Sequence, residues 1–223
     1  MKINATNAGK RFNRDWIFRH FNYEFVSGKA YAITGPNGSG KSTLLQVIAG
    51  AIAPSEGEVK YKVACYTLQD AGNKNKKTRN KGQDNNKDDF YRHISIAAPY
   101  LEVIEEMTAK EFLEFHGQFK PLLNSHSVHS ILAEVGLEDA SQKQIRYYSS
   151  GMRQRIKLAL GFFSDTPVVL LDEPCTNLDA EGIELYKKLI EEYCKNRLVI
   201  VSSNDETEYG FCEERIRITD YKL

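Results

Sequence analysis

The 223-residue sequence lacks an excess of charge of either sign, since 30 Lys and Arg balance 30 Asp and Glu. A protein that attracts a polyanion through bulk charge is therefore disfavoured, and no specific nucleic acid is expected as a partner. The longest apolar runs, at 168–171 and 198–201, are far shorter than the ~20 residues that cross a bilayer. No apolar stretch with a cleavage site follows the N-terminus, so no secretory signal is predicted.

The sequence also lacks a cysteine framework and internal repetition. Its four cysteines form no C-x-x-C pair, and a chain that can bury its own core needs no disulfide framework, so we expect reduced thiols. No repeat with a period of roughly 20 to 50 residues is present, which excludes solenoids and propellers. Hydrophobic residues at 41% and charged residues at 27% are typical of a globular protein. We therefore expect one folded domain over residues 1–223.

The strongest local signal is a glycine-rich segment between a strand expected at 31–33 and a helix expected over 43–49. It matches the phosphate-binding pattern G-x-x-x-x-G-K-[ST], in which loop amides and the helix N-terminus attract phosphate oxygens. Lys41 is expected to reach the β- and γ-phosphates of a nucleotide, and Ser42 to ligate Mg²⁺. A purely structural glycine turn is the alternative. The candidate binding residues are Gly35, Pro36, Asn37, Gly38, Ser39, Gly40, Lys41, Ser42 and Thr43.

A second signal is the apolar strand expected over 168–171, which ends in two carboxylates. Asp172 fits a direct or water-mediated partner of Mg²⁺, and Glu173 fits a general base for the water that attacks the γ-phosphate. Two acids at a strand end are by themselves more typical of a surface turn. Their combination with the glycine-rich loop predicts a nucleoside triphosphatase.

The rest of the chain alternates between strand and helix patterns, which is typical of a parallel sheet. Further strands are expected at 58–63 and 198–202, and helical segments within 101–146 and over 127–135, 151–163 and 180–193. Residues 72–89 are almost entirely polar, which predicts a solvated loop. The basic residues between Lys74 and Lys81 could touch lipid headgroups or nucleic acid, but three aspartates dilute them and a charged surface loop is the favoured interpretation.

A third motif precedes the strand expected at 168–171. Residues 148–155, Tyr-Ser-Ser-Gly-Met-Arg-Gln-Arg, resemble the signature motif of ATP-binding cassette (ABC) ATPases, and 176–179 stand in the place of the family's D-loop. The ordered set of motifs extends the resemblance over nearly the whole chain. Ser149 and Gly151 can offer a hydroxyl, an amide and a helix dipole to a γ-phosphate, although an ordinary Ser N-cap is the alternative.

The resemblance implies the ABC ATPase fold, with an α/β, P-loop NTPase core around a mainly parallel sheet. It also implies an N-terminal antiparallel β region and a helical subdomain insert. The core would comprise 1–100 and 156–223, and the helical subdomain, with the signature motif, would comprise 101–155.

The resemblance also implies ATP and Mg²⁺ as cofactors. Asp179 becomes a further candidate residue of the nucleotide site. Phe12 falls where an aromatic ring stacks on adenine in the family, with Trp16 as the competing candidate. A buried core role for Phe12 is the alternative.

Two kinds of partner follow from the resemblance. In the family, the signature of one subunit completes the nucleotide site of another, so we expect a second nucleotide-binding subunit, a second copy of this chain, and a separate integral membrane permease. The signature and the small size look more like an export-type cassette than an importer with a regulatory extension. The expected location is cytoplasmic, on the inner face of the cell membrane through the permease.

Two positions depart from the family's pattern. Tyr100 stands where the family usually has Gln, and a phenol cannot offer an amide oxygen to Mg²⁺. Asn204 stands where the family has its switch His. As a candidate catalytic residue beside Lys41 and Glu173, Asn204 can donate to a γ-phosphate oxygen but brings no positive charge, so we expect slow turnover.

Three other functions are weighed against transport. One is a soluble ABC ATPase that remodels macromolecular complexes, although the chain has neither two cassettes nor a long coiled coil. Another is a regulatory nucleotide-binding subunit that hydrolyses ATP weakly because of Tyr100 and Asn204. A small-molecule P-loop kinase would leave the signature unexplained.

Overall fold

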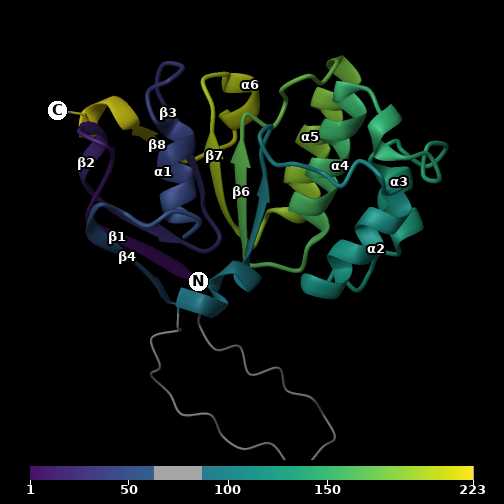
Figure 1. Ribbon diagram of the computed structural model, residues 1–223, viewed down its shortest axis with the longest axis horizontal. Helices are drawn as coiled ribbons and strands as arrows, with labels where there is room; N and C mark the ends of the chain where they lie inside the picture. Colours follow the sequence, from purple (N-terminus) through teal and green to yellow (C-terminus); the bar gives the residue numbers. More distant parts are fainter. Residues whose placement is uncertain (63–86, 223) are drawn as a thin grey trace, which may run out of the picture.

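The computed structural model describes residues 1–62 and 87–222, and its centre is a parallel sheet with the strand order β5-β6-β7-β3-β8 (Figure 1). The strands are β5 (Ile94–Ala97), β6 (Val168–Asp172), β7 (Leu198–Ser202), β3 (Ala30–Thr34) and β8 (Glu214–Arg217). Every residue of β6 and β7 is buried, as unbroken apolar runs predict for strands covered on both faces. Because the strands are parallel, the carboxyl ends of β6, β7 and β3 meet at one edge of the sheet.

A smaller antiparallel sheet, on the left in Figure 1, has the strand order β2-β1-β4. Its strands are β1 (Lys2–Phe12), β2 (Asp15–Val26) and β4 (Glu56–Lys62). Ile3 and Ala5 of β1 are buried while Lys2 and Asn4 are exposed, which is the period of two expected for a sheet with one covered face. The expected N-terminal antiparallel β region is confirmed.

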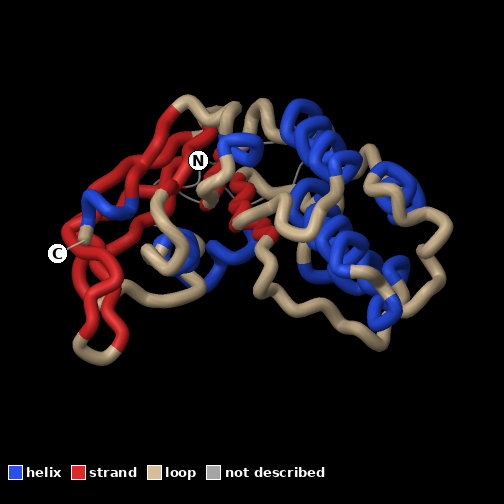
Figure 2. The backbone as a smooth tube through the Cα atoms, turned by 90° about the horizontal axis from the view of Figure 1, so that it is seen from above, coloured by secondary structure: helices blue, strands red, loops and turns tan. Residues whose placement is uncertain are grey.

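Side chains of the parallel strands alternate between two apolar cores. Val168 and Leu170 pack in the core that contains α1 (Lys41–Ile48) and the buried aromatic rings of β2. Val169 and Leu171 pack in the core that contains α4 (Ser150–Phe163) and α5 (Ala180–Tyr193). In Figure 2 most strands lie on one side of the molecule and most helices lie on the other. The carboxyl end of β6 is therefore held from both faces of the sheet.

The expected helical region contains α2 (Ala109–Phe119) and α3 (Val128–Glu134). Thr108 forms a capping box with Glu111 at the start of α2, and Ser127 caps α3. Helix α4 crosses residue 155, so the boundary expected between helical subdomain and core falls inside one helix, and this division of the chain stays a prediction. The shorter elements are α6 (Glu206–Tyr209) and the 3₁₀ turns η1 (Lys87–His93), η2 (Ile145–Tyr147) and η3 (Ile218–Tyr221).

Some sequence-based predictions lie outside the described residues. These are the polar loop at 72–89, of which the structure describes only the backbone from Lys87 onward, its basic cluster, and Cys65. Cys175, Cys194 and Cys212 are free and buried. Within residues 1–62 and 87–222, no helix combines the length and the apolar character needed to cross a membrane.

Candidate functional site

The glycine-rich loop joins the end of β3 to the start of α1, in the predicted strand–loop–helix context. Gly40 adopts a φ of 102°, and a Cβ added there would collide with the Cγ2 of Ile17 on β2. Gly35 adopts a φ of 150°, and its added Cβ would lie 2.5 Å from the Cγ2 of Ile218. Both positions therefore require glycine, because they combine a left-handed backbone with close packing against another segment.

Lys41 is the first residue of α1, and it is only 4% exposed. Its Nζ donates to the carbonyl oxygens of Gly35 at 2.9 Å and of Pro36 at 3.4 Å. The loop thus already holds the ammonium group against its own carbonyl oxygens. An anion in the loop would meet a positioned positive charge together with the N-terminus of α1.

The two carboxylates lie at the carboxyl end of β6, as predicted. Asp172 is 2% exposed, and its Oδ1 has no hydrogen-bond partner within the described part of the protein. Glu173 is partly exposed and adopts a φ of 42°, which is unusual for a residue other than glycine. Its amide donates to the carbonyl oxygen of Ser202 on β7 at 2.9 Å.

A hollow of about 390 Å³ brings the loop and one carboxylate together. It is lined by Ile17, Asn37, Gly38, Gly40, Lys41, Ser42, Thr43 and Glu173. Glu173 directly follows β6, which is far from the loop in the sequence, and its convergence with the loop is what the combination of the two motifs predicts. Ile17 was not anticipated, because nothing in its local sequence indicates that β2 passes beside Gly40.

The donor set in this region fits Mg²⁺. An orphaned buried carboxylate oxygen on Asp172 and the hydroxyl of Ser42 are hard oxygen ligands, which Mg²⁺ prefers. Among the described residues no group of three or more His, Cys, Asp or Glu side chains could hold a metal alone. Such a sparse protein set is typical of Mg²⁺ that also binds phosphates and water.

Asn204, which follows β7, is bonded to the glycine-rich loop at two points. Its Oδ1 accepts the amide of Gly35 at 3.1 Å, and its Nδ2 donates to the Oδ1 of Asn37 at 3.0 Å. Strand β7 is the direct neighbour of β3 in the sheet, which brings this segment to the loop. The structure therefore bonds Asn204 to the glycine-rich loop, and its role toward a phosphate stays a prediction from the resemblance.

Tyr100 lies near the same edge of the sheet and is about half exposed. Partial burial raises the pKa of its phenol, a hydrogen bond with the side chain of Gln46 opposes this shift, and the charge of Asp172 adds to it. Tyr100 thus lies within electrostatic range of the candidate metal ligand. Gln46 on α1 was not anticipated as a neighbour of this site.

The signature residues lie elsewhere on the chain. Ser149 is the N-cap of α4, where its Oγ accepts the amide of Met152 at 3.2 Å, and it is exposed. Ser149 and Gly151 line a second, polar hollow of about 460 Å³ with Asp179 and Arg155. Among the described residues, none lines both this hollow and the one at the glycine-rich loop.

Asp179 is the N-cap of α5 and accepts the amide of Gly182 at 2.8 Å. This backbone bond, and the neighbouring Arg155, lower the pKa of the Asp179 carboxyl. Asp179 therefore stands as an anion beside the signature residues of its own chain, on the hollow that they line. The structure does not bring it into the hollow of the glycine-rich loop.

The two aromatic candidates for adenine differ in their surroundings. Phe12 is 50% exposed, so the alternative of a buried core role is wrong. The ammonium of Lys10 lies 5.2 Å from the centroid of its ring. Trp16 is more buried, and the guanidinium groups of Arg11 and Arg19 lie 5.5 Å and 4.4 Å from its ring. Because of these contacts, less of the surface of the Trp16 ring is open to a ligand than of the surface of the Phe12 ring.

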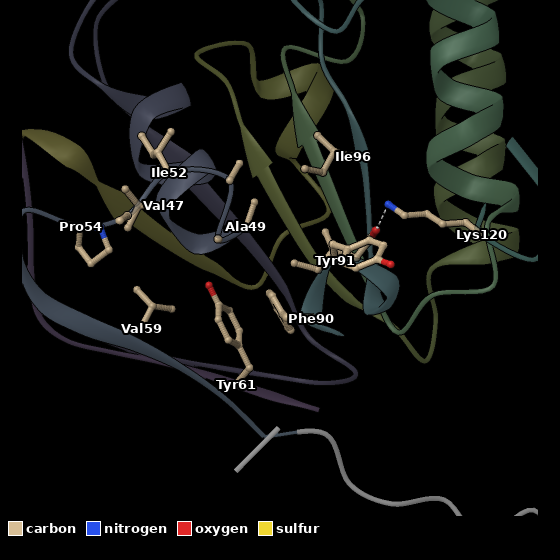
Figure 3. A pocket seen from close by; sticks show the side chains of 14 residues that line it. Val47, Ala49, Ile52, Pro54, Val59, Tyr61, Phe90, Tyr91, Ile96 and Lys120 are labelled. Carbon is tan, nitrogen blue, oxygen red and sulfur yellow. Dashed lines mark hydrogen bonds between the residues drawn. The ribbon is translucent and has the colours of Figure 1, made fainter. Parts of the chain in front are cut away.

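A third hollow, of about 260 Å³, lies between the carboxyl end of α1 and strands β4 and β5 (Figure 3). Apolar residues such as Val47, Ile52 and Phe90 dominate its lining. The ammonium of Lys120 donates to the carbonyl oxygen of Ile94 at 2.7 Å beside it. Its described lining contains no glycine-rich turn and no helix N-terminus, the two features of the loop before α1.

Comparisons with known proteins agree with this geometry. The family model described as "ABC transporter" matches residues 18–176. The chain is 24% identical to an uncharacterized ABC transporter ATP-binding protein, YybJ, of Bacillus subtilis (strain 168), over 99% of this chain and 94% of the relative. It is 31% identical to the cytochrome c biogenesis ATP-binding export protein CcmA of Rhizobium etli, over 92% and 88% of the two chains.

Solved structures that are similar in both fold and sequence include an ATP-binding cassette. The dimeric structure of a post-hydrolysis state of the ATP-binding cassette MJ0796, bound to ADP and Pi, aligns with a TM-score of 0.75 and 26% identity. The alignment covers 99% of this chain and 96% of that one. With the phosphate-binding loop, the carboxylates of β6 and the signature helix in place, this chain belongs to the ABC transporter family and is an ATP-binding subunit with ATPase activity.

Proposed function

We propose that this ATPase energises transport, in the direction of export, through a separate membrane-spanning permease. Family membership supports the transport role, and the relatives include a lantibiotic transport ATP-binding protein and a cytochrome c biogenesis ATP-binding export protein. The described residues contain no helix able to span a membrane, so the pathway for the cargo would belong to the partner. We place the chain on the cytoplasmic face of the membrane, held there by that permease.

In this proposal the glycine-rich loop binds the phosphates of ATP, with Lys41 at the β- and γ-phosphates. Ser42 and Asp172 would hold Mg²⁺, which neutralises charge on the phosphates. Glu173 accepts a proton from water as the water oxygen bonds to the γ-phosphorus, the bond to the β-phosphate oxygen breaks, and ADP leaves. Asn204 donates to an oxygen of the γ-phosphate, and Phe12 stacks on adenine.

The observation that carries a dimer is the separation of the two polar hollows on one chain. Ser149 and Gly151 are suited to a γ-phosphate but lie outside the hollow that holds Lys41 and Glu173. A second copy in head-to-tail orientation would bring the signature hollow of each copy to the loop of the other. The relative MJ0796 is described as dimeric, which supports the same arrangement here.

Transport is tested by isolating the tagged chain from its native membranes in mild detergent, with and without ATP, and identifying bound proteins by mass spectrometry. The expected result is a multispanning protein in stoichiometric yield. A cytoplasmic macromolecular complex as the only partner would contradict the proposal and favour remodelling. Recovery of the chain alone, with slow hydrolysis, would favour a regulatory role.

Replacing Asn204 by His is expected to raise the rate of ATP hydrolysis by about tenfold, because a charge-assisted hydrogen bond is roughly twice as strong as a neutral one. Phosphate release at saturating ATP measures the effect. The bonds of Asn204 to Gly35 and Asn37 also hold the loop, so the dissociation constant of ATP must be measured for both proteins. An unchanged or lower rate of hydrolysis, with unchanged ATP binding, would show that Asn204 does not slow ATP hydrolysis relative to His.

A further inference from the structure

Three charged side chains are buried at less than 5% exposure in the part of the chain that the structure describes. Lys41 and Asp172 belong to the nucleotide site. The third is Glu208 on α6, which is 4% exposed and has no role in the proposed reaction. Burying a carboxylate is costly unless hydrogen bonds compensate for the lost water, so its partners indicate what it does.

The Glu208 carboxylate joins the two segments that leave β6 and β7. Its Oε1 accepts the amide of Cys175 at 2.7 Å, two residues after Glu173. The side chain of Ser203, the residue before Asn204, also hydrogen-bonds to it. Glu208 thus ties the segment that carries the proposed base to the segment that carries Asn204.

The surroundings of Glu208 place it within electrostatic range of the base. Burial raises the pKa of its carboxyl, the hydrogen bonds with Ser203 and Cys175 oppose this shift, and the charges of Asp205 and Glu173 add to it. Glu208 itself does not line the hollow at the glycine-rich loop. Apart from this effect of its charge, its influence on the reaction passes through the backbone that it holds.

The backbone of Glu173 needs such support. A φ of 42° is unfavourable for a residue with a side chain and persists only where neighbouring structure imposes it. The amide of Glu173 is fixed by Ser202 on β7. On the other side, Glu208 fixes the amide of Cys175, and Gln154 of α4 donates to the carbonyl oxygen of Pro174 at 2.8 Å.

We infer that Glu208 is a positioning residue. It keeps the side chains of Glu173 and Asn204 correctly placed relative to each other on either side of the γ-phosphate. A general base must lie within hydrogen-bond reach of the attacking water, so a small displacement of the 173–176 turn separates the base from its water. The inference rests on the proposed roles of Glu173 and Asn204. It does not depend on the transport partner or on the direction of transport.

The test compares Glu208→Ala, Glu208→Gln and the control Glu206→Ala. Glu206 lies on the same helix but is exposed and pairs with Arg215 at 2.8 Å. For Glu208→Ala we expect kcat to fall about 10- to 100-fold, since a misplacement of about 1 Å can cost 10²-fold. The KM for ATP should stay within about twofold, because the loop residues are unchanged and Asn204 keeps its own bonds to Gly35 and Asn37.

Glu208→Gln should restore part of kcat. Its amide oxygen can still accept the Cys175 amide, but its amide nitrogen cannot accept the Ser203 hydroxyl. Because this variant is nearly isosteric, it keeps the test decisive if Glu208→Ala fails to fold. Melting temperatures and the binding of a fluorescent ATP analogue measure the folded fraction of each protein. The expected order of kcat is wild type and Glu206→Ala, then Glu208→Gln, then Glu208→Ala.

Two results would overturn the inference. One is a kcat for folded Glu208→Gln equal to that of the Glu206→Ala control. The other is a loss of activity that follows the loss of folded protein or of nucleotide binding. Measuring Glu173→Gln in parallel separates this inference from the proposed reaction. Full activity of Glu173→Gln would refute Glu173 as the base. An inactive Glu173→Gln together with fully active Glu208 variants would refute the positioning role alone.

Discussion

Replacing Glu173 by Gln is expected to lower ATP hydrolysis by about 10²- to 10⁴-fold, the range that a general base contributes. Gln has nearly the same shape but cannot accept the proton of the attacking water at neutral pH. Glu173 lines the hollow, but the backbone amides and the Lys41 ammonium that would bind phosphate belong to the glycine-rich loop. ATP binding should therefore be retained, and phosphate release together with a binding titration measures the two effects.

A matched control for this variant is Glu184→Gln on α5, whose exposed carboxylate pairs only with Lys187 among the described residues. It should hydrolyse ATP at the wild-type rate. In the proposed dimer the bound ATP lies between the two copies, so Glu173→Gln, which keeps its ATP, should also elute as a dimer in ATP for longer than the wild type does. Equally slow hydrolysis by wild type and Glu173→Gln, with both binding ATP, would favour the regulatory subunit instead.

Replacing Lys41 by Ala is expected to weaken ATP binding by about 10- to 100-fold, since hydrogen bonds to a charged group contribute about 1.5–3 kcal/mol. The hydrolytic rate should fall further, by about 10²- to 10³-fold, because the charge that develops on the phosphates loses a positioned donor. Because Lys41 is buried within the loop, water in the Lys41→Ala variant is a poor substitute for the ammonium group as a hydrogen-bond donor to phosphate. Titration with a fluorescent ATP analogue and phosphate release at several ATP concentrations separate binding from rate.

Lys110→Ala provides the control for the loss of one positive charge. Lys110 is exposed on α2, where it pairs with Glu114 at 3.9 Å, and an exposed pair of this kind contributes little to stability. This variant should bind and hydrolyse ATP as the wild type does. Unchanged ATP affinity in Lys41→Ala would place the phosphates elsewhere and remove the basis for assigning the loop to ATP.

Features that depend on neighbouring residues in the chain could be predicted from the sequence. The glycine-rich loop and its flanking β3 and α1 follow from the spacing of glycine, lysine and serine. The start of α2 follows from Thr108 and Glu111, because a capping box involves residues only three positions apart. The buried strands β6 and β7 follow from unbroken apolar runs.

Contacts between distant segments could not be predicted in the same way. The exposure of Phe12 and the packing of Ile17 against Gly40 depend on how β1 and β2 lie over the parallel sheet. The support of the 173–176 turn by Glu208 depends on α6 lying beside the segment that follows β6. No local pattern around these residues records which other segment they meet.

The sequence by itself determined the phosphate-binding loop, the carboxylates after β6, the signature at the start of α4 and the alternation of strands and helices. Only the tertiary structure decided that Asn204 bonds to Gly35 and that the signature hollow is separate from the loop. The physical reason is the strand order, in which β3 lies beside β7 although the chain reaches β5 and β6 first. Sheet pairing of this kind is set by the packing of whole strands against two cores, not by the residues at their ends.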